Sequence, residues 1–196
     1  MTYKYLSGLL FFVVFLNGHV IAQNKNLTLE DIYTNGLYRV KEIGQLRWMK
    51  DNKSYSTLEF NPAAKGIDIV RYDVASGTKT ILVNANQLLP KGAAQPLSID
   101  NYNWSEDNNR LLIFTNTRKV WRYNTRGDYW VLNLNNGKLI QLGRGLEEAT
   151  LMFAKFSPDG GRVAYVSKMN IYEEDISTGK ITQLTKDGGG HIINGP

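Results

Sequence analysis

Cationic and aromatic side chains are concentrated between residues 117 and 134, in the segment TRKVWRYNTRGDYWVLNL. A mixture of this kind can stack bases and contact phosphates, as binding sites for single-stranded nucleic acid do. An arginine in it could also project its planar guanidinium group at a carbonyl or carboxylate of a ligand. The side chains available for this chemistry are Arg118, Lys119, Arg122 and Arg126, interleaved with Trp121, Tyr123, Tyr129 and Trp130.

The charge balance of the chain argues against nucleic acid as the partner. The 196 residues carry a formal net charge of +5, which is mild and is spread along the sequence rather than gathered in one block. We therefore expect no nucleic-acid partner. The chain has no cysteine, so it forms no disulfide, thiolate metal site or cysteine nucleophile.

Catalytic machinery is not recognisable in the sequence. A serine hydrolase needs a nucleophile, a histidine base and an orienting acid, but the two histidines lie in the N-terminal segment before Gln23 (His19) and in a glycine-rich tail (His191). No G-x-S-x-G, phosphate-binding loop or H-E-x-x-H motif occurs. We expect no catalytic residue, no metal and no cofactor in this chain. The segment GRGLEE lacks the last glycine of a dinucleotide fingerprint and predicts a loop.

Two further segments have the composition of a site but a simpler interpretation. In NIYEED, Glu173 and Glu174 fall at strand positions of an internal repeat, so they should point to opposite faces of a sheet rather than form a carboxylate pair. In GGGH, residues 188–191, the glycines are typical of a connection between structural units.

Three repeats must position the cationic segment. Each begins with an aromatic residue followed three positions later by an aspartate, and each ends with a turn in which Asp or Asn stands four positions before a glycine. These residues suit tight turns between antiparallel strands. Each repeat therefore predicts four short strands, which is the blade of a β-propeller. The repeated positions are Trp48, Trp104 and Phe156, then Asp51, Asp107 and Asp159, then Asp73, Asn133 and Asp175 before Gly77, Gly137 and Gly179.

The predicted fold is all-β, a partial β-propeller of about three four-stranded antiparallel blades, with a short helix near Thr28. The repeats cover about residues 45–85, 101–145 and 153–187, within a propeller region 45–196 that follows an N-terminal segment 23–44. Insertions interrupt the first repeat at Asn61–Gly66 and the second at Thr117–Arg126. Insertions in repeats usually form loops on one face, often the binding face, and Trp121 is expected to pack the second insertion onto its blade. Three blades do not close a ring, so we expect part of a longer protein, or a homo-oligomer that completes the ring.

The N-terminus predicts export. Residues 1–22 have a lysine, an apolar run from Leu6 to Leu16 and a small-residue pattern before Gln23, which together are typical of a secretory signal peptide. The apolar run is short for a membrane span, and an uncleaved anchor is the alternative. We expect a periplasmic or secreted protein without a membrane span after cleavage.

Taken together, the segments LTLEDIY, RWMKDNKSY, TRKVWRYNTRGDYWVLNL, FSPDGGRVAYV and HIING resemble the N-terminal part of a bacterial-type dipeptidyl peptidase IV, a serine peptidase of the prolyl oligopeptidase group. The resemblance implies an exported exopeptidase that releases Xaa-Pro or Xaa-Ala dipeptides, built from a propeller and an α/β-hydrolase domain. It implies that Arg122 donates hydrogen bonds to a substrate carbonyl, supported by Trp121 and Tyr123.

The resemblance also limits what this chain can do. The family's glutamate pair for the substrate ammonium group follows IING, beyond Pro196, and its catalytic triad lies in the hydrolase domain. We therefore expect the chain alone to be inactive. The partners implied are peptide N-termini, the hydrolase domain and, as an option, a second copy of the chain in a homodimer. The alternative function is a non-catalytic exported propeller that binds peptides or glycans or acts as a scaffold.

Overall fold

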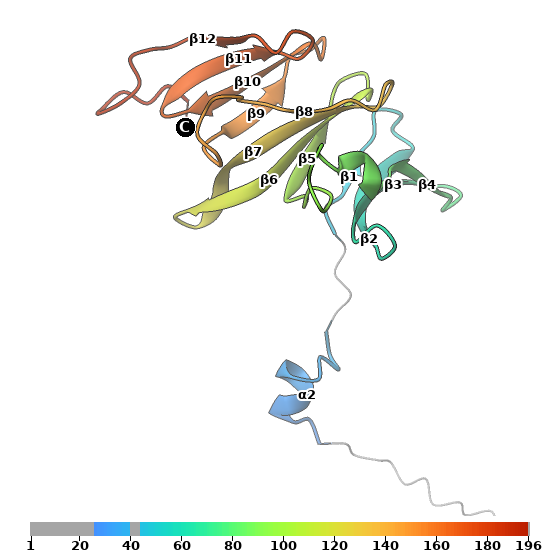
Figure 1. Ribbon diagram of the computed structural model, residues 1–196. Helices are drawn as coiled ribbons and strands as arrows, with labels where there is room; N and C mark the ends of the chain where they lie inside the picture. Colours follow the sequence, from blue (N-terminus) through green and yellow to red (C-terminus); the bar gives the residue numbers. More distant parts are fainter. Residues whose placement is uncertain (1–25, 40–43, 196) are drawn as a thin grey trace, which may run out of the picture. The chain divides into compact units, whose positions relative to one another are not determined.

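The computed structural model describes residues 26–39 and 44–195, so the predicted signal peptide lies outside the described residues (Figure 1). The chain divides into two compact units, residues 1–42 and 43–196. Every described strand belongs to the second unit, and the first contains one described helix.

The helix α2, Leu29–Tyr33, begins where the sequence predicts it. Thr28 has an extended backbone, and its hydroxyl oxygen accepts a hydrogen bond from the backbone N–H of Asp31 at 3.1 Å. Glu30 and Asp31 stand in the first turn, where negative charge interacts favourably with the helix dipole. Among the described residues, no helix is long and apolar enough to cross a membrane.

The second unit consists of three four-stranded antiparallel sheets, which we call blades 1 to 3. In each blade neighbouring strands are consecutive in the sequence, as expected for two successive hairpins. The predicted partial propeller is therefore confirmed. Blade 1 contains β1 (Arg47–Trp48), β2 (Ser54–Asn61), β3 (Gly66–Asp73) and β4 (Lys79–Val83), and is followed by the short 3-10 helix η1 (Ala85–Leu88). Blade 2 contains β5 (Asn101–Trp104), β6 (Arg110–Val120), β7 (Tyr123–Asn133) and β8 (Leu139–Gln141), and blade 3 contains β9 (Met152–Phe156), β10 (Arg162–Ser167), β11 (Asn170–Asp175) and β12 (Ile181–Gln183).

The repeated turn residues do what their types predict. In blade 2, Asp107 accepts hydrogen bonds from the Ser105 hydroxyl at 2.6 Å and from the Asn109 backbone N–H at 3.0 Å. These bonds favour the ionised carboxylate and lower the pKa of Asp107 to about 2. At the next turn Gly137 has φ of 68°, a left-handed conformation that glycine adopts without a Cβ clash. The predicted aspartate and glycine turns are therefore confirmed.

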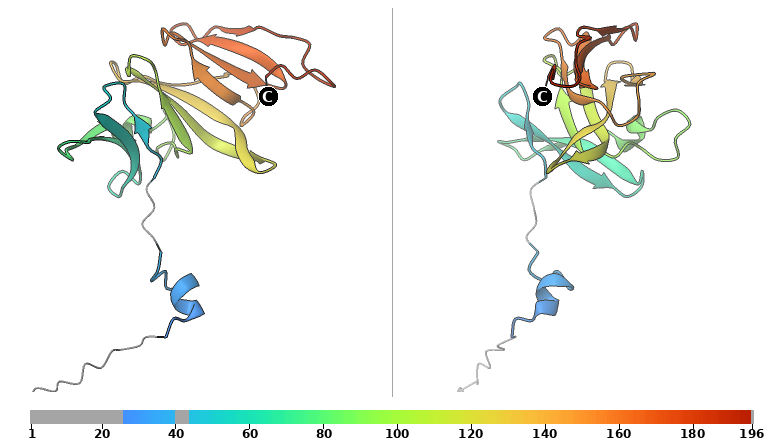
Figure 2. Two further views of the ribbon diagram at one scale, coloured as in Figure 1. Left: turned by 180° about the vertical axis from the view of Figure 1, so that it is seen from behind. Right: turned by 90° about the vertical axis from the view of Figure 1, so that its left-hand side faces the viewer.

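Blade 2 lies between the other two blades and is buried on both faces (Figure 2). Successive residues of a strand point to opposite faces, so Leu111 and Ile113 pack toward blade 1 while Leu112 packs toward blade 3. This explains the unbroken apolar run LLIF, residues 111–114, which a strand with one wet face would not have. The blade 1 contact also includes a buried hydrogen bond of 3.0 Å between the hydroxyls of Ser56 and Tyr102.

The segment GRGLEE, residues 143–148, is a loop between β8 and β9, as predicted. The segment GGGH follows blade 3 as a connection. Its first glycine is required by packing, because a Cβ on Gly188 would lie 2.0 Å from the Met169 carbonyl oxygen. His191 is exposed in the turn between Gly189 and Ile192.

Candidate functional site

The insertion Thr117–Arg126 forms a hairpin rather than the expected loop. Strands β6 and β7 are 11 residues each and continue past the rest of blade 2, with Val120 paired to Tyr123 across a two-residue turn (Figure 1). We call residues 117–126 the arm. Its threonine, valine and tyrosine residues favour extended backbone, so the two neighbouring strands continue instead of ending at the blade.

Trp121 and Arg122 form the turn at the tip of the arm. Trp121 has φ of 59°, which is uncommon for a residue with a bulky side chain. Its side chain is 93% exposed, so the expectation that Trp121 packs the insertion onto the blade is wrong. Tyr123 is 74% exposed, and Arg122 is exposed and makes no hydrogen bond or ion pair with the described residues. The tip therefore presents two aromatic rings and a guanidinium group to the surroundings.

A bulge at the base of the arm sets its direction. The register of β6 and β7 shifts between Thr115 and Arg118, and Asn116 between them has φ of 46°. Bulges bend a hairpin and often lie next to functional sites. Opposite the bulge, Gly127 has no room for a side chain, because a Cβ there would lie 2.5 Å from the Phe114 ring and 2.7 Å from the Thr115 carbonyl oxygen.

A buried aspartate next to this glycine attaches the base of the arm to the chain entering blade 3. Asp128 is 8% exposed and accepts hydrogen bonds from the Ala149 backbone N–H and from the Asn116 side-chain amide, both at 2.7 Å. Gly127 and Leu151 exchange two backbone hydrogen bonds of 3.0 and 3.1 Å. Three of these hydrogen bonds, Asp128 with Ala149 and the two between Gly127 and Leu151, therefore join the base of the arm to the chain that enters blade 3.

The same arrangement occurs in all three blades, and the sequence repeats did not predict it. Asp68 of blade 1 accepts from the Ala85 backbone N–H at 2.7 Å, and Asn170 of blade 3 accepts from the Gly188 backbone N–H at 2.9 Å. The pattern that could have revealed it is an Asp or Asn five positions before each turn residue Asp73, Asn133 and Asp175. We call Asp68, Asp128 and Asn170 the clamp residues.

The adjacent carboxylates of NIYEED do not form a site. Glu173 is paired with Arg162 at 2.8 Å on the surface, while Glu174 is 2% exposed, so the predicted placement on opposite faces is confirmed. Glu174 accepts hydrogen bonds from the Gly143 backbone N–H at 2.8 Å and from the Tyr165 hydroxyl at 3.1 Å. Burial raises its pKa, and the two hydrogen bonds and the nearby Arg144 oppose this shift only in part.

The raised pKa of Glu174 predicts a pH dependence of stability. A carboxyl with a raised pKa binds its proton more tightly in the folded state, so its contribution is full at low pH and is lost as pH rises through the folded pKa. Glu174→Gln removes this titration and keeps an acceptor for Gly143 and Tyr165. Measured by urea unfolding between about pH 4 and about pH 8, wild type should lose stability relative to Glu174→Gln as pH rises. A constant difference between the two proteins would contradict the assignment.

The fold and the arm define the class of the protein, a segment of a β-propeller in which one blade carries an elongated hairpin with a Trp-Arg tip. Residues 105–196 match the family described as the dipeptidyl peptidase IV (DPP IV) N-terminal region. The solved crystal structure of Porphyromonas gingivalis dipeptidyl peptidase 4 is 26% identical, with a TM-score of 0.68 over 84% of this chain and 22% of that one. The chain is therefore similar to the N-terminal propeller region of dipeptidyl peptidase IV.

Curated relatives agree with this assignment. A probable dipeptidyl-aminopeptidase B of Chaetomium globosum is 26% identical over 190 residues, which are 90% of this chain and 20% of the relative. Dipeptidyl aminopeptidase B of Saccharomyces cerevisiae is 29% identical over 158 residues, 77% of this chain and 18% of the relative. The chain thus spans about a fifth of the length of these relatives.

Proposed function

We propose that the chain is the N-terminal propeller region of an exported serine exopeptidase that releases Xaa-Pro or Xaa-Ala dipeptides from peptide N-termini. The similarity to proteins described as dipeptidyl peptidases and dipeptidyl aminopeptidases supports a peptidase parent. The observation that carries the proposal is the arm. It extends past its blade and presents Arg122 with no protein partner among the described residues.

In this proposal Arg122 holds the substrate backbone. A guanidinium group offers several donors in a fixed plane, and hydrogen bonds from it to a peptide carbonyl contribute about 1.5–3 kcal/mol. An arginine already paired with a carboxylate would have to break that pair first, whereas Arg122 is exposed and unpaired among the described residues. Its position at a turn, rather than within a strand, leaves its whole side chain free to reach a ligand.

Trp121 and Tyr123 are the supporting residues of the same proposal. They flank Arg122 and are 93% and 74% exposed. Large aromatic rings offer a broad apolar surface with a polar edge, which can pack against a bound peptide. The positive φ of Trp121 is a second sign, since strained backbone tends to occur at functional positions. We propose that the two rings contact the bound peptide beside the arginine.

The remaining parts of the enzyme are supplied by other residues of the parent protein. We propose that a C-terminal α/β-hydrolase domain provides the catalytic triad, that the propeller helps to control access of peptides, and that the protein acts in the periplasm or outside the cell. The chain on its own should not hydrolyse peptides, because it has no G-x-S-x-G motif. A homodimer is compatible with this arrangement.

The test is an analysis of reaction products. The protein translated from the complete reading frame is incubated with a peptide that has Gly-Pro at its N-terminus, and products are identified by mass spectrometry. We expect release of the Gly-Pro dipeptide, and no release from the N-acetylated peptide or with the 196-residue chain alone. Single-residue release, internal cleavage or no cleavage would overturn the proposal. A reading frame that stops after Pro196 and yields a stable soluble protein would favour the non-catalytic propeller.

A further inference from the structure

A cavity of about 410 Å³ lies between the arm and blade 3. The arm forms one wall, and the β10–β11 turn with the chain that follows blade 3 forms another. Its size is in the range of cavities that hold small ligands or peptide side chains. The residues that line it are Arg118, Lys119, Val120, Arg126, Glu147, Ala149, Thr150, Met152, Val166, Lys168, Met169, Ile193 and Gly195.

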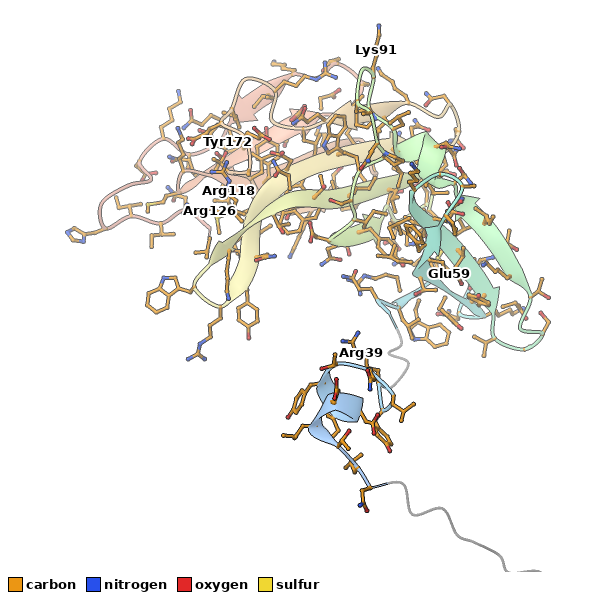
Figure 3. The ribbon with its side chains drawn as sticks, turned by 60° about the horizontal axis from the view of Figure 1, so that its bottom comes forward. Arg39, Glu59, Lys91, Arg118, Arg126 and Tyr172 are labelled. Atoms are coloured by element: carbon orange, nitrogen blue, oxygen red, sulfur yellow. The ribbon has the colours of Figure 1, made fainter. Side chains whose placement is uncertain are left out.

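The cavity carries an excess of positive charge. Four cationic side chains line it against one carboxylate, Glu147, which pairs with Lys168 at 3.4 Å. Arg118 and Arg126 are direct partners across the arm, and their side chains lie side by side (Figure 3). Neither makes a hydrogen bond or an ion pair with its side chain among residues 26–39 and 44–195. Like charges placed opposite each other on two strands destabilise the pair.

The floor of the cavity is apolar. Val166 and Ala149 are 8% and 1% exposed, and Met152 is half-buried beside them. The methionine side chain adapts to ligands of different shape. A phosphate or another small inorganic anion would use the cations but would leave this floor wet. A ligand that combines a carboxylate with an adjoining apolar side chain would use both.

We propose that this cavity binds an acidic residue and a neighbouring apolar residue of an extended peptide, and that Arg118 and Arg126 are the specificity-determining pair. The claim that this peptide is a substrate rests on the proposed function. The claim that it binds in the cavity does not. One carboxylate placed between the two guanidinium groups neutralises their mutual repulsion and accepts hydrogen bonds from both. A negative charge on the ligand therefore reduces the repulsion between Arg118 and Arg126 that destabilises the arm when no ligand is bound.

The test measures binding to the 196-residue chain itself. Two fluorescein-labelled, N-acetylated octapeptides are compared. They differ at one position next to a leucine, which is Glu in one peptide and Gln in the other. Acetylation removes the free N-terminus, so the result does not depend on whether Arg122 and the proposed peptidase function are correct. We expect the Kd of the Glu peptide, measured by fluorescence anisotropy, to be at least about tenfold lower than that of the Gln peptide. A tenfold ratio corresponds to one charge-assisted hydrogen bond at an exposed site.

The variant Arg118→Ala/Arg126→Ala should abolish the preference for the Glu peptide. The matched control is Lys53→Ala/Lys91→Ala, which removes the same formal charge from exposed positions away from the arm and should keep the preference (Figure 3 shows Lys91). The single variant Arg126→Glu should shift the preference toward a Lys peptide, and it provides a second test if the double variant does not fold. Equal affinity for the Glu and Gln peptides in wild type, equal losses in both double variants, or equally effective competition by inorganic phosphate would each overturn the proposal.

Discussion

Replacing Asp128 by alanine is expected to lower the free energy of unfolding by about 2–4 kcal/mol. The substitution removes the acceptor of two hydrogen bonds of 2.7 Å, one from the Ala149 backbone N–H and one from the Asn116 side chain. Ala149 is 1% exposed, so its N–H would be left without a partner and without water. The base of the arm would also lose one of its links to the chain that enters blade 3 and would keep the two backbone bonds between Gly127 and Leu151.

Urea unfolding of the 196-residue chain measures this effect, with two substitutions as comparisons. Asp68→Ala removes the equivalent bond to Ala85 in blade 1 and should reduce stability by a similar amount. Asp100 is exposed and its side chain makes no hydrogen bond with the described residues, so Asp100→Ala should change the free energy of unfolding by less than about 0.5 kcal/mol. If Asp128→Ala and Asp100→Ala had equal effects, the clamp residues would have no special role.

The blade architecture was predictable because its determinants are local. Each turn is specified by a few adjacent residues, as when Asp107 accepts from Ser105 and Asn109, or when Gly137 adopts a left-handed conformation. These turn residues recur at the same places in three repeats, so each repeat supports the interpretation of the others. The apolar run LLIF follows from the burial of blade 2 on both faces.

The clamp residues were not predicted because their partners are distant in sequence. Asp128 bonds to Ala149, 21 positions later, and Asn170 bonds to Gly188, 18 positions later. An aspartate within a strand has no local feature that distinguishes an exposed position from a buried one. Only the packing of one blade against the next excludes water from it and makes the hydrogen bond essential.

The residue types of the candidate site were evident in the sequence, but their arrangement was not. The length of the insertion between two strands does not say whether the chain forms a loop or continues as paired strands. The bulge at Asn116 decides which arm residues face one another, and it places Arg118 opposite Arg126. The same geometry leaves Trp121 in the turn, where the blade offers no surface against which it could pack.

Replacing Arg122 by alanine in the protein translated from the complete reading frame is expected to lower kcat/KM for Gly-Pro-anilide by about 10- to 150-fold. The expected loss corresponds to the hydrogen bonds that the guanidinium group would donate to the substrate carbonyl. Arg122→Lys keeps the charge but not the planar arrangement of donors, so its kcat/KM should fall between the values of wild type and Arg122→Ala. Stability should not change, because Arg122 is exposed and contacts no described residue through a hydrogen bond or ion pair.

The central claim is that the arm of a peptidase propeller holds the substrate. The most direct test measures kcat/KM for Gly-Pro-anilide in wild type, Arg122→Ala and Lys138→Ala. Lys138 is an exposed cation of the same blade, in the turn that follows β7, at the end of that strand opposite the arm. We predict a loss of at least about tenfold for Arg122→Ala and wild-type values within about twofold for Lys138→Ala. Equal values for wild type and Arg122→Ala would contradict the account.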